Sequence, residues 1–450
     1  MRESECPRGR ARGHRFGRDI IVLMFSLWHL ILVAAWGSAD GPVATSQALP
    51  ASDHAPLRAT TDASWFRSTY VDVKDTLPRL RVERAWVHHM DATWAYAHHP
   101  YLTRYKGTWY AMWSSSRRDE DAGGQRVAFA SSPDLRTWSP SRALAEPGMG
   151  KDGKEAVLTP AGFLEHGGTL AAFYSRYEHD MTGTRMFVVR TQDGETWSAP
   201  EDIGVPSCPN AGPRPIAGGR LILAGNTTFP YTDDPSGLTG WRTAALHPWN
   251  LTNPEDNPRT FWDVQKVAGW PVGLCSSAFF ETRDGTVRML LRARGEQGWR
   301  LWLSDSTDRG ETYSPPAPTE FLDNDASFQF GTLPDGLVGG ARVWYVGYPD
   351  PARGWARSRL VLSTSSDDKV FDRHWLIADE PYDIQQHGQY KLGEYSYPHV
   401  TVIDGMMYIL VSREKEAIEV IWLDLALLNT LPGAATDPAE SADAPATNSR

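Results

Sequence analysis

A short motif that recurs at nearly constant spacing constrains this 450-residue chain more than any other feature. The fullest copy is Ser306–Tyr313, and weaker copies begin at Ser132, Thr191 and Ser365. Each has a hydroxyl residue, an Asp two positions later and an aromatic residue a few positions beyond. The copies begin 59, 115 and 59 residues apart, so we expect one repeat to have lost the motif while keeping its place. Such a period indicates a repeat architecture.

The motif has a physical explanation as a turn. An Asp beside Gly or polar residues suits a tight turn in which the carboxylate accepts backbone N–H bonds. The aromatic residue then packs between adjacent sheets. The motif resembles the Asp-box turn of sialidases and related β-propellers, which joins the third and fourth strands of a blade. The resemblance implies a role in folding, not in catalysis.

Between about residue 81 and residue 430, the chain consists of short alternating segments bounded by Gly, Pro, Asp and Asn. With the Asp-box spacing, they predict an all-β, six-bladed, sialidase-like β-propeller, or seven blades if residues 60–95 hold further strands. We expect a long insertion in place of the box in the third repeat. The last repeat lacks a fourth strand, and Arg81–His88 is a candidate to supply it and so close the ring.

The two ends are predicted to lie outside this fold. Residues 1–39 combine six Arg, an apolar run from Ile20 to Trp36 and the small residues Gly37-Ser38-Ala39, a pattern typical of a signal peptide. We therefore expect a secreted or periplasmic protein, anchored in a membrane only if the signal is not cleaved. Residues 40–80 are predicted to be an extended lead-in, and residues 431–450, rich in Pro, Ala, Thr and Asp, a disordered, solvated tail.

Charge and cysteine content narrow the choice of partners. Removal of residues 1–39 takes away six Arg and three acidic residues, which moves the formal net charge from −10 to −13. This charge argues against nucleic acid and anionic membrane surfaces as partners. Cys208 and Cys275 are the cysteines that remain, and a disulfide between them or two buried thiols are equally good interpretations. We expect a monomer without a cofactor.

Inner strands of a propeller face its central channel, so polar residues at their starts are the first candidates for a site. Ala97-His98-His99-Pro100, followed by a Lys-Gly turn, resembles the sialidase segment with the Phe/Tyr-Arg-Ile-Pro motif. The resemblance places His98 where that family has the first Arg of its carboxylate-binding triad. Because adjacent strand residues point to opposite faces, we expect at most one of the two histidines to line the channel. A hydrogen-bonded structural histidine is the alternative.

Metal binding is not predicted. The sequence has no HExxH motif or Cys/His cluster, and the pairs His88-His89 and His98-His99 lack ligand spacing on one face of a strand.

The second strands supply further candidates. Sialidases place their acid/base Asp in the loop after such a strand, so Asp119 or Asp121 is expected to match it, with a merely solvated loop as the alternative. Arg176 and Tyr177, adjacent at a strand end, are candidates to bind a sugar and its acid group. Arg214 occupies a predicted inner strand, together with Asn210, where a charge must be paired or face water.

The later repeats match the sialidase pattern in part. Arg292 matches the second Arg of the triad, and Arg359, in preference to Arg357, matches the third. Tyr395 stands at the family's nucleophilic Tyr. The Glu that activates this nucleophile in sialidases is replaced here by Ser276.

These residues imply an exported carbohydrate-active enzyme that cleaves a glycosidic bond next to an acidic sugar. It is either a sialidase-like exo-glycosidase or a uronate-directed lyase or rhamnosidase, whose His/Tyr/Arg sites this set also resembles. In a lyase, Arg residues neutralise the sugar carboxylate and acidify the adjacent C–H, and a neutral His or an ionised Tyr removes the proton. The departures at His98 and Ser276 disfavour true sialic acid cleavage. The alternative from another class is a glycan-binding propeller without catalysis.

Overall fold

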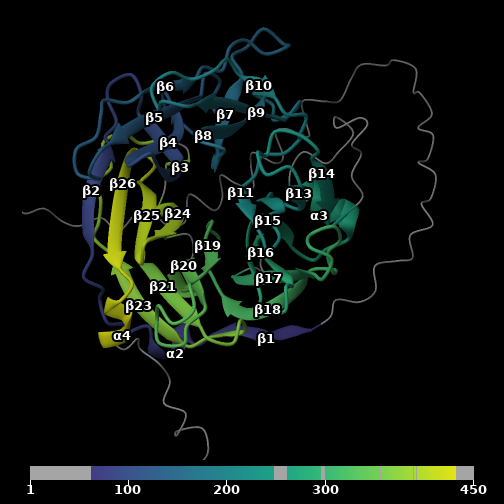
Figure 1. Ribbon diagram of the computed structural model, residues 1–450, viewed down its shortest axis with the longest axis vertical. Coiled ribbons are helices and arrows are strands. Elements are labelled where there is room, and N and C mark those ends of the chain that lie inside the picture. Colours follow the sequence, from purple (N-terminus) through teal and green to yellow (C-terminus); the bar gives the residue numbers. More distant parts are fainter. Residues whose placement is uncertain are drawn as a thin grey trace, which may run out of the picture. The chain divides into compact units, whose positions relative to one another are not determined.

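The computed structural model describes residues 62–247, 261–294, 299–353, 356–388, 390–391 and 393–431 (Figure 1). The predicted signal peptide, the lead-in before residue 62 and the tail beyond residue 431 lie outside these residues. Within the described part of the chain, every helix is too short or too polar to cross a membrane.

The described residues form an all-β propeller, as predicted. Five sheets have four antiparallel strands each, the usual content of a propeller blade, and a further sheet has six strands. The four-stranded sheets are, in turn, β3 (Tyr96–Tyr105), β4 (Thr108–Ser116), β5 (Arg126–Ser132) and β6 (Arg142–Ala145); β7 (Val157–His166), β8 (Thr169–Tyr177), β9 (Arg185–Thr191) and β10 (Glu201–Asp202); β11 (Ala211–Pro215), β12 (Leu221–Ala224), β13 (Thr228–Thr232) and β14 (Arg242–Ala245); β19 (Gln329–Thr332), β20 (Val343–Gly347), β21 (Leu360–Ser365) and β23 (Arg373–Ala378); and β24 (Ser396–Ile403), β25 (Met406–Arg413), β26 (Ala417–Asp424) and β2 (Glu83–His88).

The six-stranded sheet joins segments that are far apart in the sequence. It contains β15 (Gly273–Glu281), β16 (Val287–Arg294), β17 (Arg300–Ser306), β18 (Ala317–Leu322), β1 (Ala63–Ser68) and β22 (Val370–Phe371). Strand β1 runs parallel to both β18 and β22. Part of residues 40–80, which were predicted to be an extended lead-in, is therefore the strand β1, which pairs with β18 on one side and β22 on the other.

The sheet arrangement closes on itself. Strand β2 pairs antiparallel with β26, which confirms that the segment before residue 90 supplies the missing strand of the last repeat. Strands β3, β7 and β11 lie side by side, β12 contacts β15, β15 contacts β19, and β24 lies between β19 and β3 (Figure 1). The innermost strands of successive sheets therefore surround a common centre.

Short turns set the register of each sheet. The hairpin between β3 and β4 turns at Lys106 (φ 48°) and Gly107 (φ 85°), and that between β24 and β25 turns at Asp404 (φ 52°) and Gly405 (φ 79°). Two consecutive positive φ angles are what a tight two-residue hairpin requires. The helical segments are short: α2 (Tyr70–Val73), α3 (Phe261–Ala268), the 3₁₀ turn η2 (Pro351–Arg353) and α4 (Leu427–Thr430).

The Asp boxes form the turns that the sequence predicts. In the fullest copy, Asp308 Oδ1 accepts hydrogen bonds from the backbone N–H groups of Glu311 (3.1 Å) and Thr312 (2.9 Å). This turn joins β17 to β18, the third and fourth strands of their repeat. Its aromatic residue Tyr313 packs against Phe229 of the preceding sheet, with ring centroids 4.7 Å apart. The box thus fixes a turn and fills the space between sheets.

The prediction that one repeat lost its box was wrong. Between β13 and β14, Asp234 accepts hydrogen bonds from the backbone N–H groups of Ser236 (2.9 Å) and Thr239 (3.0 Å). Trp241 donates its indole N–H to the Gly237 carbonyl (2.9 Å). Trp138 likewise donates to a carbonyl of its own box, that of Leu135 (2.8 Å). The long insertion follows β14 and does not replace the box. The Trp of this copy follows its Asp at a distance two residues longer than the aromatic residue of the fullest copy does. A comparison at fixed spacing therefore does not detect it.

Candidate functional site

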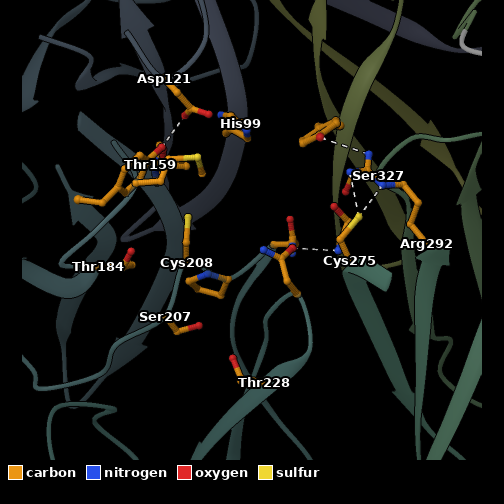
Figure 2. Close-up of a pocket in the computed structure, with 18 of the residues that line it drawn as sticks. His99, Asp121, Thr159, Thr184, Ser207, Cys208, Thr228, Cys275, Arg292 and Ser327 are labelled. Carbon is orange, nitrogen blue, oxygen red and sulfur yellow. Dashed lines mark hydrogen bonds between the residues drawn. The ribbon is translucent and has the colours of Figure 1, made fainter. Parts of the chain in front are cut away.

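The inner strands converge on a cavity of about 300 Å³. Its walls come from β3, β7, β8, β15, β16, β24 and α3, from the loops after β4 and β8 and from the segments that precede β11, β13 and β19. Figure 2 shows His99 and Asp121 on one side of this cavity and Cys275 and Arg292 on the other. A site that so many sheets build depends on closure of the ring.

Three of the cavity residues that lie on innermost strands have left-handed backbones. His99 (φ 51°), Ser276 (φ 44°) and Tyr397 (φ 51°) each lie on an innermost strand, at a point where the pairing with the second strand shifts register. Such bulges redirect side chains, and a left-handed non-glycine residue stores strain that is common at functional sites. The bulges break the strict alternation of strand faces next to the cavity.

One wall of the cavity centres on Arg292. Its guanidinium lies 3.3 Å from the Asp325 carboxylate, and its Nε and Nη2 donate to Cys275 Sγ at 3.3 Å. Its Nη1 lies 3.4 Å from the Tyr397 hydroxyl oxygen. Asp325 also accepts a hydrogen bond from Arg294 (2.8 Å). Of the described residues that line the cavity, Arg292 is the one with a guanidinium or ammonium group.

The opposite wall carries two carboxyl groups with different surroundings. Tyr177 donates a 2.5 Å hydrogen bond to Asp121 Oδ1, and its hydroxyl lies 2.8 Å from Thr159 Oγ1. Burial, and then the charge of Glu120, raises the pKa of Asp121. Burial also opposes ionisation of Glu120, but Lys415 and the imidazoles of His99 and His98 outweigh it and hold the pKa of that carboxyl well below its usual range. Adjacent carboxyls with divergent pKa values are typical of acid–base pairs.

Both cysteines of the described chain lie at the cavity as free thiols. Cys275 is buried and accepts the Arg292 hydrogen bonds. Burial raises the pKa of the Cys208 thiol to about 12, which keeps it protonated. Of the two interpretations left open by the sequence, the structure has the unpaired thiols.

The structure brings three of the predicted site residues to the cavity: Asp121, Tyr177 and Arg292. Two of the other residues predicted to be catalytic, His98 and Tyr395, are buried. His98 is fully buried, and burial holds its pKa well below the usual range. Tyr395 is also fully buried, donates to Glu380 (2.8 Å) and stacks under the Arg413 guanidinium. Neither lines the cavity.

The remaining predicted residues bind other parts of the chain. Asp119 accepts the backbone N–H of Tyr390 (3.1 Å), and Arg176 bonds Glu178 and the Met149 carbonyl. Arg359 donates to the Lys74 carbonyl (3.0 Å). Arg214 donates to the carbonyls of Phe330 and Phe279, so it joins three sheets, and burial lowers its pKa to about 10.

His99 and Tyr397 line the cavity at the places expected for His98 and Tyr395; the sequence left open which of the two adjacent histidines does so and did not single out Tyr397. The Tyr397 ring lies 4.3 Å from that of His98 and 5.2 Å from that of His99, and the Arg357 guanidinium lies 5.3 Å from it. A usable signal was present, because His99 and Tyr397 each precede a proline at the start of an inner strand, as does the cavity residue Thr159.

Comparison with solved structures shows the same fold at low sequence identity. A Dyadobacter fermentans protein of unknown function is 14% identical with a TM-score of 0.52, and the match covers 76% of this chain and 98% of that one. A Trypanosoma rangeli sialidase mutant with trans-sialidase activity is 13% identical with a TM-score of 0.53, covering 78% and 61%. A Hadza microbial sialidase is 15% identical with a TM-score of 0.52, covering 74% and 66%. This chain thus spans less than two thirds of both sialidases.

Among curated proteins, no sequence matches this chain. A family comparison, in contrast, matches residues 107–409 to the BNR repeat-like domain. This match covers most of the sheets and the Asp boxes that join their third and fourth strands. The chain therefore belongs to the BNR repeat-like family, with a sialidase-like propeller fold.

Proposed function

We propose that this protein cleaves a glycosidic bond next to an acidic sugar. The observation that carries the proposal is the placement of Arg292 and Tyr397 on one wall of the cavity and of Asp121, held by Tyr177, on the other. The cavity volume of about 300 Å³ lies at the small end of ligand pockets, which suits one sugar unit. The sialidase-like fold makes a carbohydrate substrate the natural class.

The residues divide into roles by their chemistry. The Arg292 guanidinium suits the sugar carboxylate, because it offers planar paired donors to a carboxylate. We assign to Asp121, which lines the cavity, the protonation of the leaving glycosidic oxygen. Tyr397, beside Arg292, is placed to act on the sugar ring itself, either as nucleophile at the anomeric carbon or as base.

Elimination is the second candidate reaction. It is favoured by Ser276, which occupies the cavity position where a hydrolase of this fold is expected to carry its activating Glu. In elimination, the base takes the proton next to the carboxylate, the electron pair forms a C=C bond, and the leaving oxygen takes a proton from Asp121. Hydrolysis adds water instead and leaves a saturated sugar.

The proposal extends to the whole chain. We propose that the propeller has six blades and that β15–β18 form the blade to which β1 and β22 are added. We also propose that the protein is a monomer and that it acts on glycans after export. The export signal lies in residues 1–39 and is tested by sequencing the N-terminus of the mature protein.

The test is a substrate panel read by two signals. The protein is incubated with uronate-containing polysaccharides and with a sialoside reporter, while new reducing ends and the absorbance of an unsaturated sugar are recorded. Reducing ends with the absorbance establish elimination, and reducing ends without it establish hydrolysis. Binding of an acidic glycan without any turnover would instead support a non-catalytic glycan-binding propeller.

A matched pair of Arg variants tests the location of the site. Arg292→Ala is expected to abolish turnover of acidic substrates, whereas Arg359→Ala, whose side chain bonds the Lys74 carbonyl away from the cavity, is expected to retain it. Equal losses in both variants, or full activity in Arg292→Ala, would place the reaction elsewhere.

A further inference from the structure

Two histidines and a glutamate converge beside the cavity. His98 and His99 lie on β3, and Glu120 lies in the loop after β4. Glu120 Oε1 is 3.3 Å from His99 Nε2 and 3.8 Å from His98 Nε2, and one ligand atom from each of the three residues lies within 4.8 Å of the others. Three such groups offer two imidazole nitrogens and one carboxylate oxygen to a common point.

The bulge at His99 explains how adjacent strand residues come together. In a regular strand, the two imidazoles would point to opposite faces. His99 has a φ of 51°, and the pairing of β3 with β4 shifts between His98 and Tyr101. The two rings therefore lie with centroids 4.3 Å apart. The expectation that this pair lacks ligand spacing was wrong for this reason. The expectation that at most one of the two lines the channel agrees with the cavity, which His99 lines and His98 does not.

Each of the three groups is oriented by a second residue. That residue bonds the outer atom of the group and leaves Nε2 of each histidine and Oε1 of Glu120 facing the common point. His98 Nδ1 bonds Ser412 Oγ (2.6 Å), His99 Nδ1 bonds Ser114 Oγ (3.0 Å), and Lys415 bonds the other Glu120 oxygen (2.5 Å). Outer partners of this kind are typical of metal ligands, because they fix the ring orientation and the tautomer.

An unpartnered buried atom points independently to a missing ligand. His98 is fully buried, and its Nε2 has no hydrogen-bond partner among the described residues. A buried polar atom left without a partner loses its hydration without replacement, so native proteins rarely keep one without a reason. A cation bound between Nε2 of His98, Nε2 of His99 and Oε1 of Glu120 would satisfy it.

We propose that His98, His99 and Glu120 bind a divalent transition-metal ion of the zinc class. Bonds of about 2.0–2.1 Å in a tetrahedral site place ligand atoms about 3.3 Å apart. The Glu120 oxygen lies 3.3 and 3.8 Å from the two imidazole nitrogens, and all three atoms lie within 4.8 Å of one another. Two imidazoles favour such an ion over Ca²⁺ or Mg²⁺, which prefer oxygen ligands. His99 and Glu120 line the cavity, so the remaining coordination position faces the space where a substrate or water would lie.

Lys415 is the feature that opposes metal binding. Its ammonium group neutralises Glu120 and lies at the rim of the proposed site. In a metal-free alternative, the imidazoles, the carboxylate and Lys415 form a closed network of charges and hydrogen bonds. Because Lys415 contacts Oε2 while the imidazoles face Oε1, the proposed metal and the lysine would use different oxygens.

Metal binding itself is the test, and it does not depend on the proposed glycan cleavage. Untagged protein is stripped with a chelator and titrated with Zn²⁺ by calorimetry, and Co²⁺ is added separately to record the visible spectrum of a low-symmetry site. One equivalent per chain is expected. His99→Ala and Glu120→Gln, which remove proposed ligands, are expected to weaken binding by about 100-fold or more. Ser412→Ala, which removes an outer partner, is expected to weaken it by about 10-fold. Circular dichroism of each variant checks the fold.

Two controls separate this site from other causes. His179 Nδ1 lies 3.0 Å from Asp152 in a partly exposed pair, so His179→Ala measures adventitious binding by an imidazole–carboxylate pair outside the proposed site and should leave the affinity unchanged. Asp121→Asn, which removes the proposed proton donor of glycan cleavage, should still bind one equivalent. Absence of stoichiometric binding, or equal affinity in folded His99→Ala and the unsubstituted protein, would overturn the proposal in favour of the metal-free network.

Discussion

Asp119 and Asp121 are two residues apart in one loop, yet only Asp121 lines the cavity. Asp121→Asn keeps the size of the side chain and removes the proton that the leaving oxygen needs. We expect kcat/KM on the substrate identified by the panel to fall by about 100-fold or more, the usual effect of losing a general acid. Asp119→Asn is expected to change it by less than threefold, since Asp119 accepts a backbone N–H away from the cavity. Similar losses in both variants would remove Asp121 from its proposed role.

The strain at the cavity bulges is also open to test, at Ser276. Ser276→Gly should raise the unfolding free energy by about 1 kcal/mol, because glycine adopts a left-handed backbone without the steric cost of a Cβ. The neighbouring Ser277→Gly should lower it instead, since Ser277 is buried, has no positive φ and bonds the Gly225 carbonyl. Denaturant titration measures both. Destabilisation by Ser276→Gly would mean that the serine side chain contributes more than the strain costs.

Bulges also explain where sequence reasoning missed the site. The positions of the strands and the hairpin turns follow from alternation and from Gly-containing pairs, which act locally. The assignment of His98 and Tyr395 rested on their positions in the resemblance to sialidases, whereas one extra residue at His99 and at Tyr397 changes which side chain reaches the cavity. The proline after each residue marks its position, but a residue before proline ordinarily favours an extended backbone, so the shift depends on packing between inner strands.

At the scale of elements, the turn at Thr232–Trp241 should stabilise the protein as much as the fullest Asp box does. Asp234→Ala removes the acceptor of two backbone N–H bonds, and Asp308→Ala does the same in the box after β17. Each substitution is expected to cost about 1–3 kcal/mol of unfolding free energy. Asp335→Ala, at an exposed turn, is the control for loss of a surface carboxylate. An effect of Asp234→Ala no larger than that of the control would mean that this turn is held by other contacts.

Much of the architecture was therefore accessible from the repeated box alone. The box after β13 escaped detection because its Trp follows its Asp by seven residues, whereas Asp308 and Tyr313 of the fullest copy are five apart. Likewise, β1 could not be predicted, since its partners β18 and β22 lie more than 240 residues away. Pairing between such distant segments depends on the closed fold and not on local pattern.

For the whole molecule, closure of the ring depends on one strand from the N-terminal side. Ala85 pairs with Val420 across β2 and β26. Ala85→Pro removes a backbone donor from this strand and should destabilise the protein by about 3 kcal/mol, as proline does within regular structure. Ala85→Ser keeps the N–H and should have little effect. Thermal unfolding compares the two, and equal melting temperatures would show that β2 contributes little to closure.

Buried neutral histidines give the whole molecule a defined response to acid. Burial lowers the pKa of His374 to about 3, against an ordinary value of 6.5, while its ring bonds Ser363 and Thr69. Between these pH values the unfolded chain binds a proton that the folded chain rejects. The unfolding free energy should therefore be fully retained above pH 6.5 and fall towards pH 3, by up to about 1.4 kcal/mol per pH unit for each such histidine. Denaturant titrations from pH 8 to pH 4 measure the slope. Stabilities of His374→Gln and of the unsubstituted protein are normalised at pH 8. The variant should then show a slope smaller by up to about 1.4 kcal/mol per pH unit, the contribution of one proton. An unchanged slope would show that His374 does not couple folding to protonation.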